Sequence, residues 1–497
     1  MDQMIGADFL QLSPGVAPAR GLTGWLADAI RAAIMDGRLR AGAPLPPTRL
    51  LAGDLGVSRG VIVEAYQRLA DEGLVSARSG AGTRVLGVPR PASGAAPGPG
   101  TATGPGTVGS GAVGPGAVGP GAAGPLAGPL PVPPGWRERA EIDLSPGVPD
   151  LSGFPRAAWM RAERAVLEQA SVTELGYGDP RGSLALRTEL AGWLARTRGL
   201  RAGPGDIIVT TGVAQALALL ARVLRARGLG EIAVEDPGSR GARDDLAYWG
   251  LRPVPVPVDE HGMRVGELAL GQARAALLTP AHQFPTGVVL APQRRRDLLD
   301  WAAATDGLIV EDDYDAEFRY DRAPVPALHA SAPGLVAYAG STSKTLAPGM
   351  RLGWLIPPAR LRADLTEAKY ASDLGSPALP QLVLARLIAS GELERHIRLV
   401  RKRQRSRRDA LLRALREHLP EARVQGVAAG LHLLITFPRL TGSDADLAET
   451  ILRAGVLVQP LSWHRQRPGA AGFVLGYAAH TPDRLHEAAR RIGQALR

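Results

Sequence analysis

The chain has 497 residues and a formal net charge of +10 at pH 7. This length predicts two or three domains. Cysteine is absent, which excludes disulfides, thiolate metal ligands and cysteine nucleophiles, and we expect no metal site. There is no apolar run of about 18 residues and no charged-then-apolar leader, so we expect a soluble cytoplasmic protein without membrane contact.

The first predicted domain spans residues 20–88 and follows an N-terminal tail at 1–19. Apolar residues recur at helical spacing over 22–35. A second short helix is predicted over 48–55, and a third over 59–72 with Ser58 as its N-cap. Residues 74–78 and 83–86 flank a Ser-Gly-Ala-Gly turn and predict a hairpin. Three helices and a hairpin make a winged helix-turn-helix.

Arginines mark one side of this domain. Arg49 opens the second helix, Arg59 opens the third and Arg78 lies on the hairpin. In such domains the start of the third helix reaches base edges in the major groove, and arginines of the wing and helix ends hold phosphates. A small helical domain with a solvated basic face is the alternative. The candidate DNA-binding residues are Arg49, Ser58, Arg59, Gly60, Arg78, Gly80 and Thr83.

The same segment resembles the GntR family of bacterial regulators. The resemblance is carried by Gly42-Ala43-Pro44-Leu45-Pro46-Pro47-Thr48-Arg49, Leu55-Gly56-Val57-Ser58-Arg59, Ala65-Tyr66-Gln67-Arg68-Leu69, Glu72-Gly73-Leu74 and Ser79-Gly80-Ala81-Gly82-Thr83. It implies that the domain binds double-stranded operator DNA.

Glycine, proline and alanine dominate residues 89–135. A segment without apolar periodicity cannot bury enough surface to offset its ordering entropy, so we expect a flexible linker. Its mean reach is on the order of 35 to 40 Å. Such a linker would not fix the spacing between two DNA half-sites, which predicts binding to direct or variably spaced repeats.

Residues 136–497 alternate short apolar runs with helix-like runs. The apolar runs are 206–210, 231–235, 275–279, 308–311 and 335–338. Buried parallel strands separated by helices have this character, so the fold class is α/β. Ligands of such sheets bind at the carboxyl ends of the strands, where the polar residues of these runs fall.

Two polar segments near these strand ends suit pyridoxal phosphate. Lys344, one of three lysines in the chain, follows Ser341 and Ser343 and precedes Arg351. The amine can close a Schiff base on the aldehyde, while hydroxyls and a guanidinium neutralise the phosphate. The acidic run that starts at Glu311 can keep the pyridine nitrogen protonated. An isolated surface lysine, and a metal site or solvated loop at the acidic run, are the alternatives.

From about residue 142 to its end the chain resembles fold-type I aminotransferases. The motifs are Asp143-Leu144-Ser145-Pro146-Gly147-Val148-Pro149-Asp150, Tyr177-Gly178-Asp179-Pro180-Arg181-Gly182, Glu235-Asp236-Pro237-Gly238, His282-Gln283-Phe284-Pro285-Thr286-Gly287, the run from Glu311 to Tyr320, and the Lys344 segment. With its N-terminal domain, the chain is similar to the MocR regulators, which include GABA-sensing and pyridoxal-phosphate-sensing members. The resemblance implies a large domain over about 170–375, and a small domain built from the N-terminal segment and about 376–497.

The resemblance also implies residue roles. Lys344 would form the internal aldimine with the cofactor, pyridoxal 5'-phosphate, Asp312 would bind its pyridinium, and Tyr314 its ring oxygen. The other implied contacts are Gln283 or His282 near the ring, Ser341, Ser343, Arg351 and the helix start Gly212-Val213-Ala214 at the phosphate, and Tyr177 at the phosphate of the neighbouring subunit. A homodimer follows from the last contact.

Three positions depart from the aminotransferase pattern. Val213 and Ala214 stand where a hydroxyl residue often binds phosphate, and Ser239 stands where an aromatic is usual. Val474 occupies the position at or beside which an arginine clamps the substrate carboxylate, and valine cannot do so. Arg465 and Arg467 on a nearby loop are possible substitutes.

These observations predict a pyridoxal-phosphate-dependent transcriptional regulator that senses the cofactor itself, and hence controls vitamin B6 synthesis, or senses a small amine or amino acid. An active aminotransferase with a fused DNA-binding domain is the main alternative, although we expect at most partial transamination. A non-specific DNA-binding protein is a third hypothesis. The basic run 395–408 is expected to be a solvated helix face, with auxiliary DNA contact as its alternative.

Overall fold

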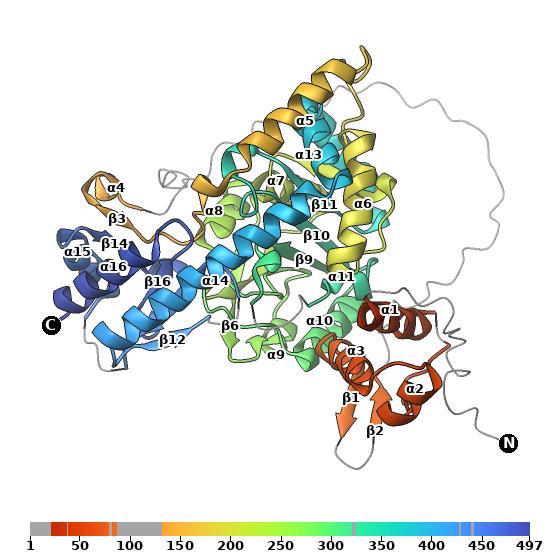
Figure 1. Cartoon of the computed structure of the whole chain (residues 1–497), viewed down its shortest axis with the longest axis horizontal. Coiled ribbons are helices and arrows are strands. Elements are labelled where there is room, and N and C mark those ends of the chain that lie inside the picture. Colours follow the sequence, from red (N-terminus) through yellow and green to blue (C-terminus); the bar gives the residue numbers. More distant parts are fainter. Residues whose placement is uncertain are drawn as a thin grey trace.

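The computed structural model describes residues 21–36, 38–78, 82–86, 132–320, 325–426, 429–438 and 442–497. Nearly all of the predicted linker lies outside the described residues. A winged helix-turn-helix and a large α/β unit form the described parts (Figure 1). Within these ranges no helix is both long and apolar enough to cross a membrane.

The N-terminal domain has the predicted elements. They are α1 Leu22–Met35, α2 Thr48–Asp54, α3 Arg59–Asp71, β1 Val75–Arg78 and β2 Gly82–Val85. β1 and β2 pair antiparallel. The apolar faces of the three helices meet in one core that includes Leu26, Ile30, Leu51, Ile62 and Leu69. Leu26 and Ile30 fall at the helical spacing predicted for the first helix, and Ile62 and Leu69 lie on the inward face of the third.

A buried ion pair joins α1 to the end of α3. Arg31 donates from Nε and Nη2 to the two carboxylate oxygens of Glu72, at 2.6 Å in both cases. Both side chains are almost fully removed from solvent. A bidentate pair of this kind fixes the two helices in angle as well as in distance.

The large domain is built on an eight-stranded sheet. Its order is β4-β11-β10-β9-β8-β5-β6-β7. The strands are β4 Ile208–Thr210, β5 Glu231–Asp236, β6 Arg252–Asp259, β7 Gly262–Met263, β8 Ala275–Leu278, β9 Leu308–Asp313, β10 Val336–Ser341 and β11 Gly353–Ile356. The five predicted strands are confirmed as β4, β5, β8, β9 and β10, whereas β6, β7 and β11 were not predicted.

Two of the unpredicted strands depart from the predicted pattern of apolar parallel strands. β6 carries Pro253, Pro255 and Pro257 at alternate positions, so all three missing N–H groups lie on one side of the strand. Its other side pairs with β5, while β7 meets only its last two residues. β11 runs antiparallel between β10 and β4, although the apolar-run pattern led us to expect parallel strands.

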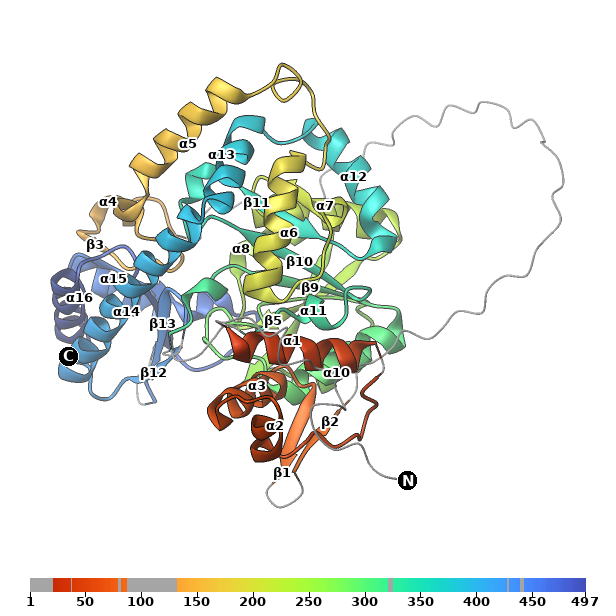
Figure 2. The ribbon, with the colours of Figure 1, turned by 45° about the vertical axis from the view of Figure 1, so that its right-hand side comes forward.

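Helices cover both faces of the sheet (Figure 2). On one face lie α7 Val213–Ala226, α8 Arg240–Tyr248 and α12 Ala359–Asp373. On the other lie α6 Leu184–Arg198, α9 Val265–Ala269, α10 Pro292–Thr305, α11 Leu328–Ser331 and α13 Ala378–Ala389, with α5 Arg156–Gln169 packed on α13. This three-layer arrangement removes both faces of the strands from water.

The small domain combines two distant parts of the chain. Its sheet has the order β12-β13-β16-β15, formed by Arg423–Gln425, His432–Thr436, Gly472–Gly476 and Gln459–Pro460. β3 Ile142–Asp143, which follows α4 Trp136–Arg139, pairs with β14 Val456–Leu457. The covering helices are α14 Glu392–His418, α15 Asp444–Arg453 and α16 Pro482–Ala495.

The basic run on α14 is only partly the solvated face that we predicted. Arg395, Arg398 and Arg405 are exposed. Arg401, in contrast, donates to the carbonyl of Glu317, and Arg407 pairs with the buried Asp150 at 3.0 Å. The prediction was wrong for these two residues because α14 packs between the two domains, so that one of its polar faces meets protein rather than water.

We predict that Arg31→Met destabilises the N-terminal domain by about 3 to 5 kcal/mol, because it leaves the buried Glu72 carboxylate without its cation. Chemical denaturation of the full chain, followed by circular dichroism, measures the loss. Arg68→Met is the matched control, since Arg68 pairs with Glu64 on the surface of the same domain and should cost under about 1 kcal/mol. Equal losses in both variants would contradict the prediction.

Candidate functional site

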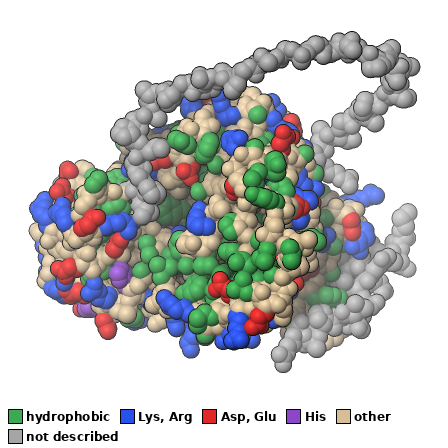
Figure 3. All heavy atoms as spheres, turned by 90° about the horizontal axis from the view of Figure 1, so that it is seen from above, with side chains coloured by type: hydrophobic (Ala, Val, Ile, Leu, Met, Phe, Trp, Pro, Cys, Tyr) green, Lys and Arg blue, Asp and Glu red, His purple; other side chains and the backbone are tan. Residues whose placement is uncertain are grey.

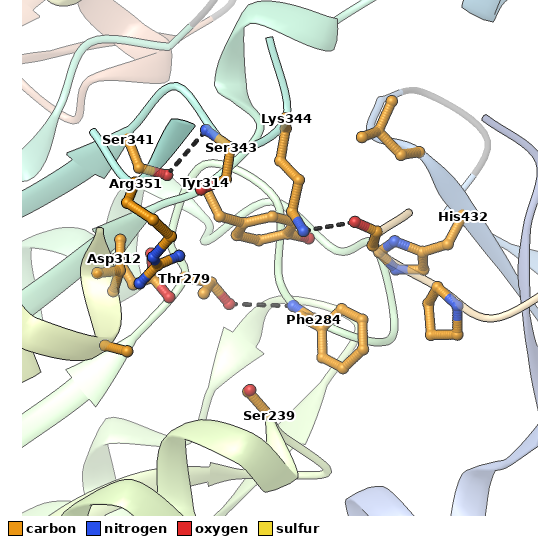
Figure 4. Close-up of a pocket in the computed structure, with 15 residues that line it drawn as sticks. Ser239, Thr279, Phe284, Asp312, Tyr314, Ser341, Ser343, Lys344, Arg351 and His432 are labelled. Atoms are coloured by element: carbon orange, nitrogen blue, oxygen red, sulfur yellow. Dashed lines mark hydrogen bonds between the residues drawn. The ribbon is translucent and has the colours of Figure 1, made fainter. Parts of the chain in front are cut away.

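A cavity of about 300 Å³ opens at the carboxyl ends of β9 and β10, between the large and small domains. Figure 4 shows the side chains that line it. The lining residues are Pro146, Gly147, Val213, Ala214, Ser239, Thr279, Phe284, Asp312, Tyr314, Ser341, Ser343, Lys344, Arg351, Leu431 and His432. The structure therefore gathers eight of the twelve residues expected around a cofactor: Val213, Ala214, Asp312, Tyr314, Ser341, Ser343, Lys344 and Arg351.

Lys344 brings its amine into this cavity just after β10. Its Nζ donates to the carbonyl oxygen of Gly147 at 2.5 Å. Burial lowers the pKa of the Lys344 amine, and the charges of Asp315 and Asp312 oppose that shift. A lowered pKa raises the fraction of neutral amine, which is the form that attacks a carbonyl carbon.

Asp312 lies at the end of β9 and, among the carboxylates of residues 311–315, is the one without a protein partner in the described part of the chain. Its Oδ1 is buried and accepts no hydrogen bond there. Burial, followed by the neighbouring charge of Asp313, raises the pKa of Asp312 to about 7. A cationic ring nitrogen would supply both the missing donor and the missing charge.

The neighbouring acids each have protein partners, although Asp313, like Asp312, keeps a buried Oδ1 without a hydrogen bond in the described residues. Glu311 accepts from the backbone N–H groups of Leu328 and His329 at the start of α11, at 2.9 and 3.0 Å. Asp313 binds the guanidinium of Arg198 and the hydroxyl of Tyr338, at 2.6 Å each. Strand alternation directs Glu311 and Asp313 to one face of the sheet and Asp312 to the other.

A second part of the cavity suits an anion. Arg351 has no hydrogen-bond or ion-pair partner within the described residues, and its backbone is left-handed, with φ of 48°. It lies against the start of α7: a Cβ on Gly212 would stand 3.1 Å from Arg351 Nη2. No side chain caps the N–H groups at this helix start. A phosphate placed here would meet a guanidinium, helix N–H groups and the hydroxyls of Ser341 and Ser343.

His282 and Gln283, expected beside the cofactor ring, lie behind the cavity wall. The Gln283 amide donates to the carbonyl of Pro237 at 2.9 Å and accepts from the N–H of Thr286 at 3.0 Å. His282 Nδ1 lies 3.0 Å from the hydroxyl of Tyr314 and 3.0 Å from Asp315. His282 thus supports Tyr314, a lining residue, while Gln283 shapes the loop.

Seven lining residues were not among the predicted cofactor contacts: Pro146, Gly147, Ser239, Thr279, Phe284, Leu431 and His432. Phe284 lies one position after Gln283, so the motif located the loop but not the side chain that points inward. Thr279 donates to Glu235 at 2.8 Å and also accepts from the N–H of Phe284. His432 comes from the small domain, and no local pattern marks it.

The end of the cavity away from Arg351 carries no arginine among its lining residues. Val474 is fully buried in β16 opposite Leu434 and does not line the cavity. Arg465 donates to the carbonyl of Ala470, and Arg467 donates to the carbonyl of Pro255. Neither loop arginine lines the cavity as a substitute clamp.

Tyr177 lies away from this cavity, with 93% of its surface exposed. It borders a separate depression formed by residues 173–187 and 373–382. In a single chain it therefore has no access to the anion site. Its expected role depends on a second subunit.

The candidate DNA-binding residues sit around the starts of α2 and α3. Arg49, Ser58, Arg59 and Gly60 are exposed, and Arg59 Nε donates to the Thr48 hydroxyl at 3.3 Å. Ser58 is the N-cap of α3, although its side chain makes no capping bond. Thr83 lies half-buried on β2 and Arg78 ends β1, while Gly80 lies outside the described residues.

Comparisons with known proteins match both parts of the chain. Residues 139–492 match the family of aminotransferase class I and II, and residues 22–85 match the gntR family of bacterial regulatory proteins. The chain is 34% identical to the HTH-type pyridoxine biosynthesis transcriptional regulator PdxR of Corynebacterium glutamicum, over 95% of each chain. It is 32% identical to the probable rhizopine catabolism regulatory protein MocR of Rhizobium meliloti, over 95% of this chain and 93% of that one.

Among solved structures, the chain is similar to a kynurenine aminotransferase of Pyrococcus horikoshii. The TM-score is 0.67 at 29% identity, and the match covers 71% of this chain and 90% of the aminotransferase. It is also similar to LysN, an α-aminoadipate aminotransferase of Thermus thermophilus, with a TM-score of 0.66 at 27% identity, over 73% of this chain and 93% of that one.

Asp312 gives a pH-dependent prediction for the cofactor-free protein. Because its folded pKa lies above the unfolded value, its charged form is disfavoured in the fold, so stability falls as pH rises from about 4 to about 7. The full effect at pH 8 is on the order of 4 kcal/mol. Asp312→Asn removes this titration, so the variant should be more stable than the natural chain at pH 8.

Denaturation of both chains at pH 5 and pH 8 checks this. The stability gain of Asp312→Asn should shrink by more than half at pH 5. A gain that does not change with pH would show that Asp312 titrates normally. The comparison reports the Asp312 carboxylate together with its electrostatic coupling to neighbouring acids such as Asp313 and Glu235, which the substitution also removes.

Proposed function

The chain belongs to the HTH-type transcriptional regulators that join a gntR-family domain to an aminotransferase class I and II domain, and from this premise we propose that its effector is pyridoxal 5'-phosphate itself. The single observation that carries the proposal is one cavity that combines a scarce amine with a carboxylate and a guanidinium that have no partner in the described part of the chain. These are Lys344, Asp312 and Arg351.

The side chains present fit this cofactor. When bound, pyridoxal phosphate supplies an aldehyde that reacts reversibly with amines and a ring that withdraws electrons. Asp312 holds a proton at the ring nitrogen, Arg351 and the start of α7 neutralise the phosphate, and Lys344 supplies the amine. His282 holds the Tyr314 hydroxyl at the cavity wall, with Asp315 behind it.

The other end of the cavity supports the cofactor as effector rather than an amino acid. A carboxylate that enters there meets Phe284, Leu431 and His432 and no guanidinium among the lining residues. Burial and the nearby His282 lower the pKa of His432 well below its usual range, so His432 is neutral. A carboxylate desolvated without a cation is costly to bury. The name of the relative PdxR, a pyridoxine biosynthesis transcriptional regulator, agrees with a regulator of vitamin B6 synthesis.

We further propose that the regulator is a homodimer in which Tyr177 reaches the phosphate of the partner. Exposed apolar side chains on and after α5 include Met160, Leu167, Val172, Leu175 and Leu184. Figure 3, which views the molecule of Figure 1 from above, shows apolar side chains gathered on this face. Exposed apolar patches of this kind mark protein interfaces.

We predict that Lys344→Ala abolishes the visible absorption band that the natural chain acquires with added pyridoxal phosphate. Lys402→Ala is the matched control, because Lys402 is an exposed lysine of α14 and its loss should leave the band unchanged. Fluorescence anisotropy with an operator fragment, with and without pyridoxal phosphate, then measures DNA affinity. The affinity of the natural chain should change with the cofactor, and that of Lys344→Ala should not.

Two results would contradict the proposal. One is a natural chain whose operator affinity is indifferent to saturating pyridoxal phosphate. The other is steady-state transamination of common amino acids at ordinary enzyme rates, which would favour the aminotransferase alternative. Salt titrations on different DNA sequences separate specific from non-specific binding. The affinity of a non-specific binder falls with salt concentration but shows no preference among sequences.

A further inference from the structure

The N-terminal domain touches the large domain at Gly73, the residue that follows the C-terminal end of α3. The Gly73 carbonyl accepts a hydrogen bond from Arg296 Nη1 at 3.1 Å. A Cβ on Gly73 would stand 2.8 Å from the carbonyl oxygen of Pro292, in the first turn of α10. Gly73 is buried and has φ of 75°, so both the close approach and the backbone favour glycine. Figure 2 shows α1 and α3 beside α10.

Both sides of this contact are rigidly supported. Glu72, the residue before Gly73, is held by the bidentate Arg31 pair inside the N-terminal domain. In the large domain, Arg295 is buried and donates to the carbonyl of Pro326 at 2.8 Å. Leu298 and Trp301 pack α10 into the core beneath the sheet. Neither domain can therefore deform easily at the contact, so a relative movement of the two domains would strain or break it.

The contact leaves the DNA-reading end of α3 free. Gly73 follows the last turn of α3, whereas Ser58 and Arg59 stand at its first turn. A helix of 13 residues is about 20 Å long. Arg49 and Arg59 are exposed in this docked arrangement. Docking is therefore compatible with DNA binding and does not mask the recognition residues.

We propose that the first turn of α10 is a docking site for the N-terminal domain of the same chain, and that docking sets the distance between the two DNA half-sites read by a dimer. The inference rests on the proposed dimeric regulator. It replaces the expectation from the linker alone, whose reach on the order of 35 to 40 Å would leave half-site spacing open. A docked domain adds a fixed direction for each recognition helix.

The docking contact is small enough to be reversible. It includes one guanidinium–carbonyl hydrogen bond and a close backbone approach. Electrostatic attraction of Arg295 to Glu72 and Asp71 adds to it. A hydrogen bond from a charged donor contributes only about 1.5 to 3 kcal/mol. Operators of unsuitable spacing can therefore still be bound, but only after the contact at Gly73 is broken. The structure thus predicts graded discrimination between spacings rather than an absolute requirement.

The test uses the full chain and a family of DNA duplexes. A half-site is first selected from random-sequence DNA by the full-length protein, and two copies are then placed at separations that increase by one base pair. Anisotropy at fixed salt gives the ratio of affinities between the best and worst spacing. We expect a ratio of roughly tenfold or more for the natural chain, as for two sites linked at a matched distance. Arg296→Glu should reduce the ratio to below about threefold.

Matched variants separate docking from general damage. Arg222→Glu makes the same charge change at an exposed arginine of α7 and should keep the natural ratio. Gly73→Ala should lower the ratio of affinities between the best and worst spacing, whereas Gly42→Ala should leave it unchanged. Gly42 has a similar backbone, with φ of 82°, but no atom within 4 Å of its added Cβ. Thermal melting confirms that each variant is folded.

The outcomes distinguish this inference from the proposed function. Loss of spacing preference in Arg296→Glu and Gly73→Ala, with both controls unchanged, supports docking. An unchanged preference in Arg296→Glu, or a natural chain that binds every spacing equally, overturns docking while leaving a specific DNA-binding regulator. A natural chain that selects no sequence at all overturns both.

Discussion

The acidic run at the end of β9 is the constraint on which the site depends. Four carboxylates, Glu311, Asp312, Asp313 and Asp315, are crowded into five residues at the edge of a buried sheet. Such groups are tolerated only when they are paired or hydrogen-bonded. Helix N–H groups satisfy Glu311, Arg198 and Tyr338 satisfy Asp313, and His282 satisfies Asp315. Of these four, only Asp312 has no hydrogen-bond or ion-pair partner among the described residues, so a cationic ligand that reaches Asp312 relieves an electrostatic cost already present in the fold.

The arginines follow a similar division between structure and function. The chain is strongly basic, yet many guanidinium groups are committed to carbonyls and carboxylates within the protein. Arg187, Arg198 and Arg295 are buried, and even the basic run on α14 is partly turned inward. Net charge is therefore a poor guide to DNA binding here. Two arginines without such commitments in the described residues lie where a ligand can reach them: Arg351 in the cavity and Arg49 at the start of α2.

Local patterns predicted the fold where local rules decide it. The bounds of α1, read from its apolar spacing, agree with the structure at both ends, and the strands before Asp312 and Lys344 were found because buried parallel strands are continuously apolar. β11 was missed because the direction of a strand depends on the whole sheet. β6 was missed because its prolines are compatible with a strand only where one of its sides makes no backbone hydrogen bonds.

The motif containing His282 and Gln283 located the correct loop, but the direction of each side chain is set by tertiary contacts with Asp315 and Pro237. The Gly73 contact joins residues more than 200 positions apart, and no spacing rule reaches that far.

The amine of Lys344 links the cavity to the segment that leads back toward the DNA-binding domain. Its Nζ donates to the carbonyl of Gly147, which lies between β3 and α5 on the small-domain side of the cavity. Closing a Schiff base would replace two hydrogens of this nitrogen by a double bond to carbon, so cofactor binding would alter the Gly147 contact. A ligand shifts a conformational equilibrium only through a difference in affinity between states. A change at this one nitrogen would supply such a difference between arrangements of the two domains.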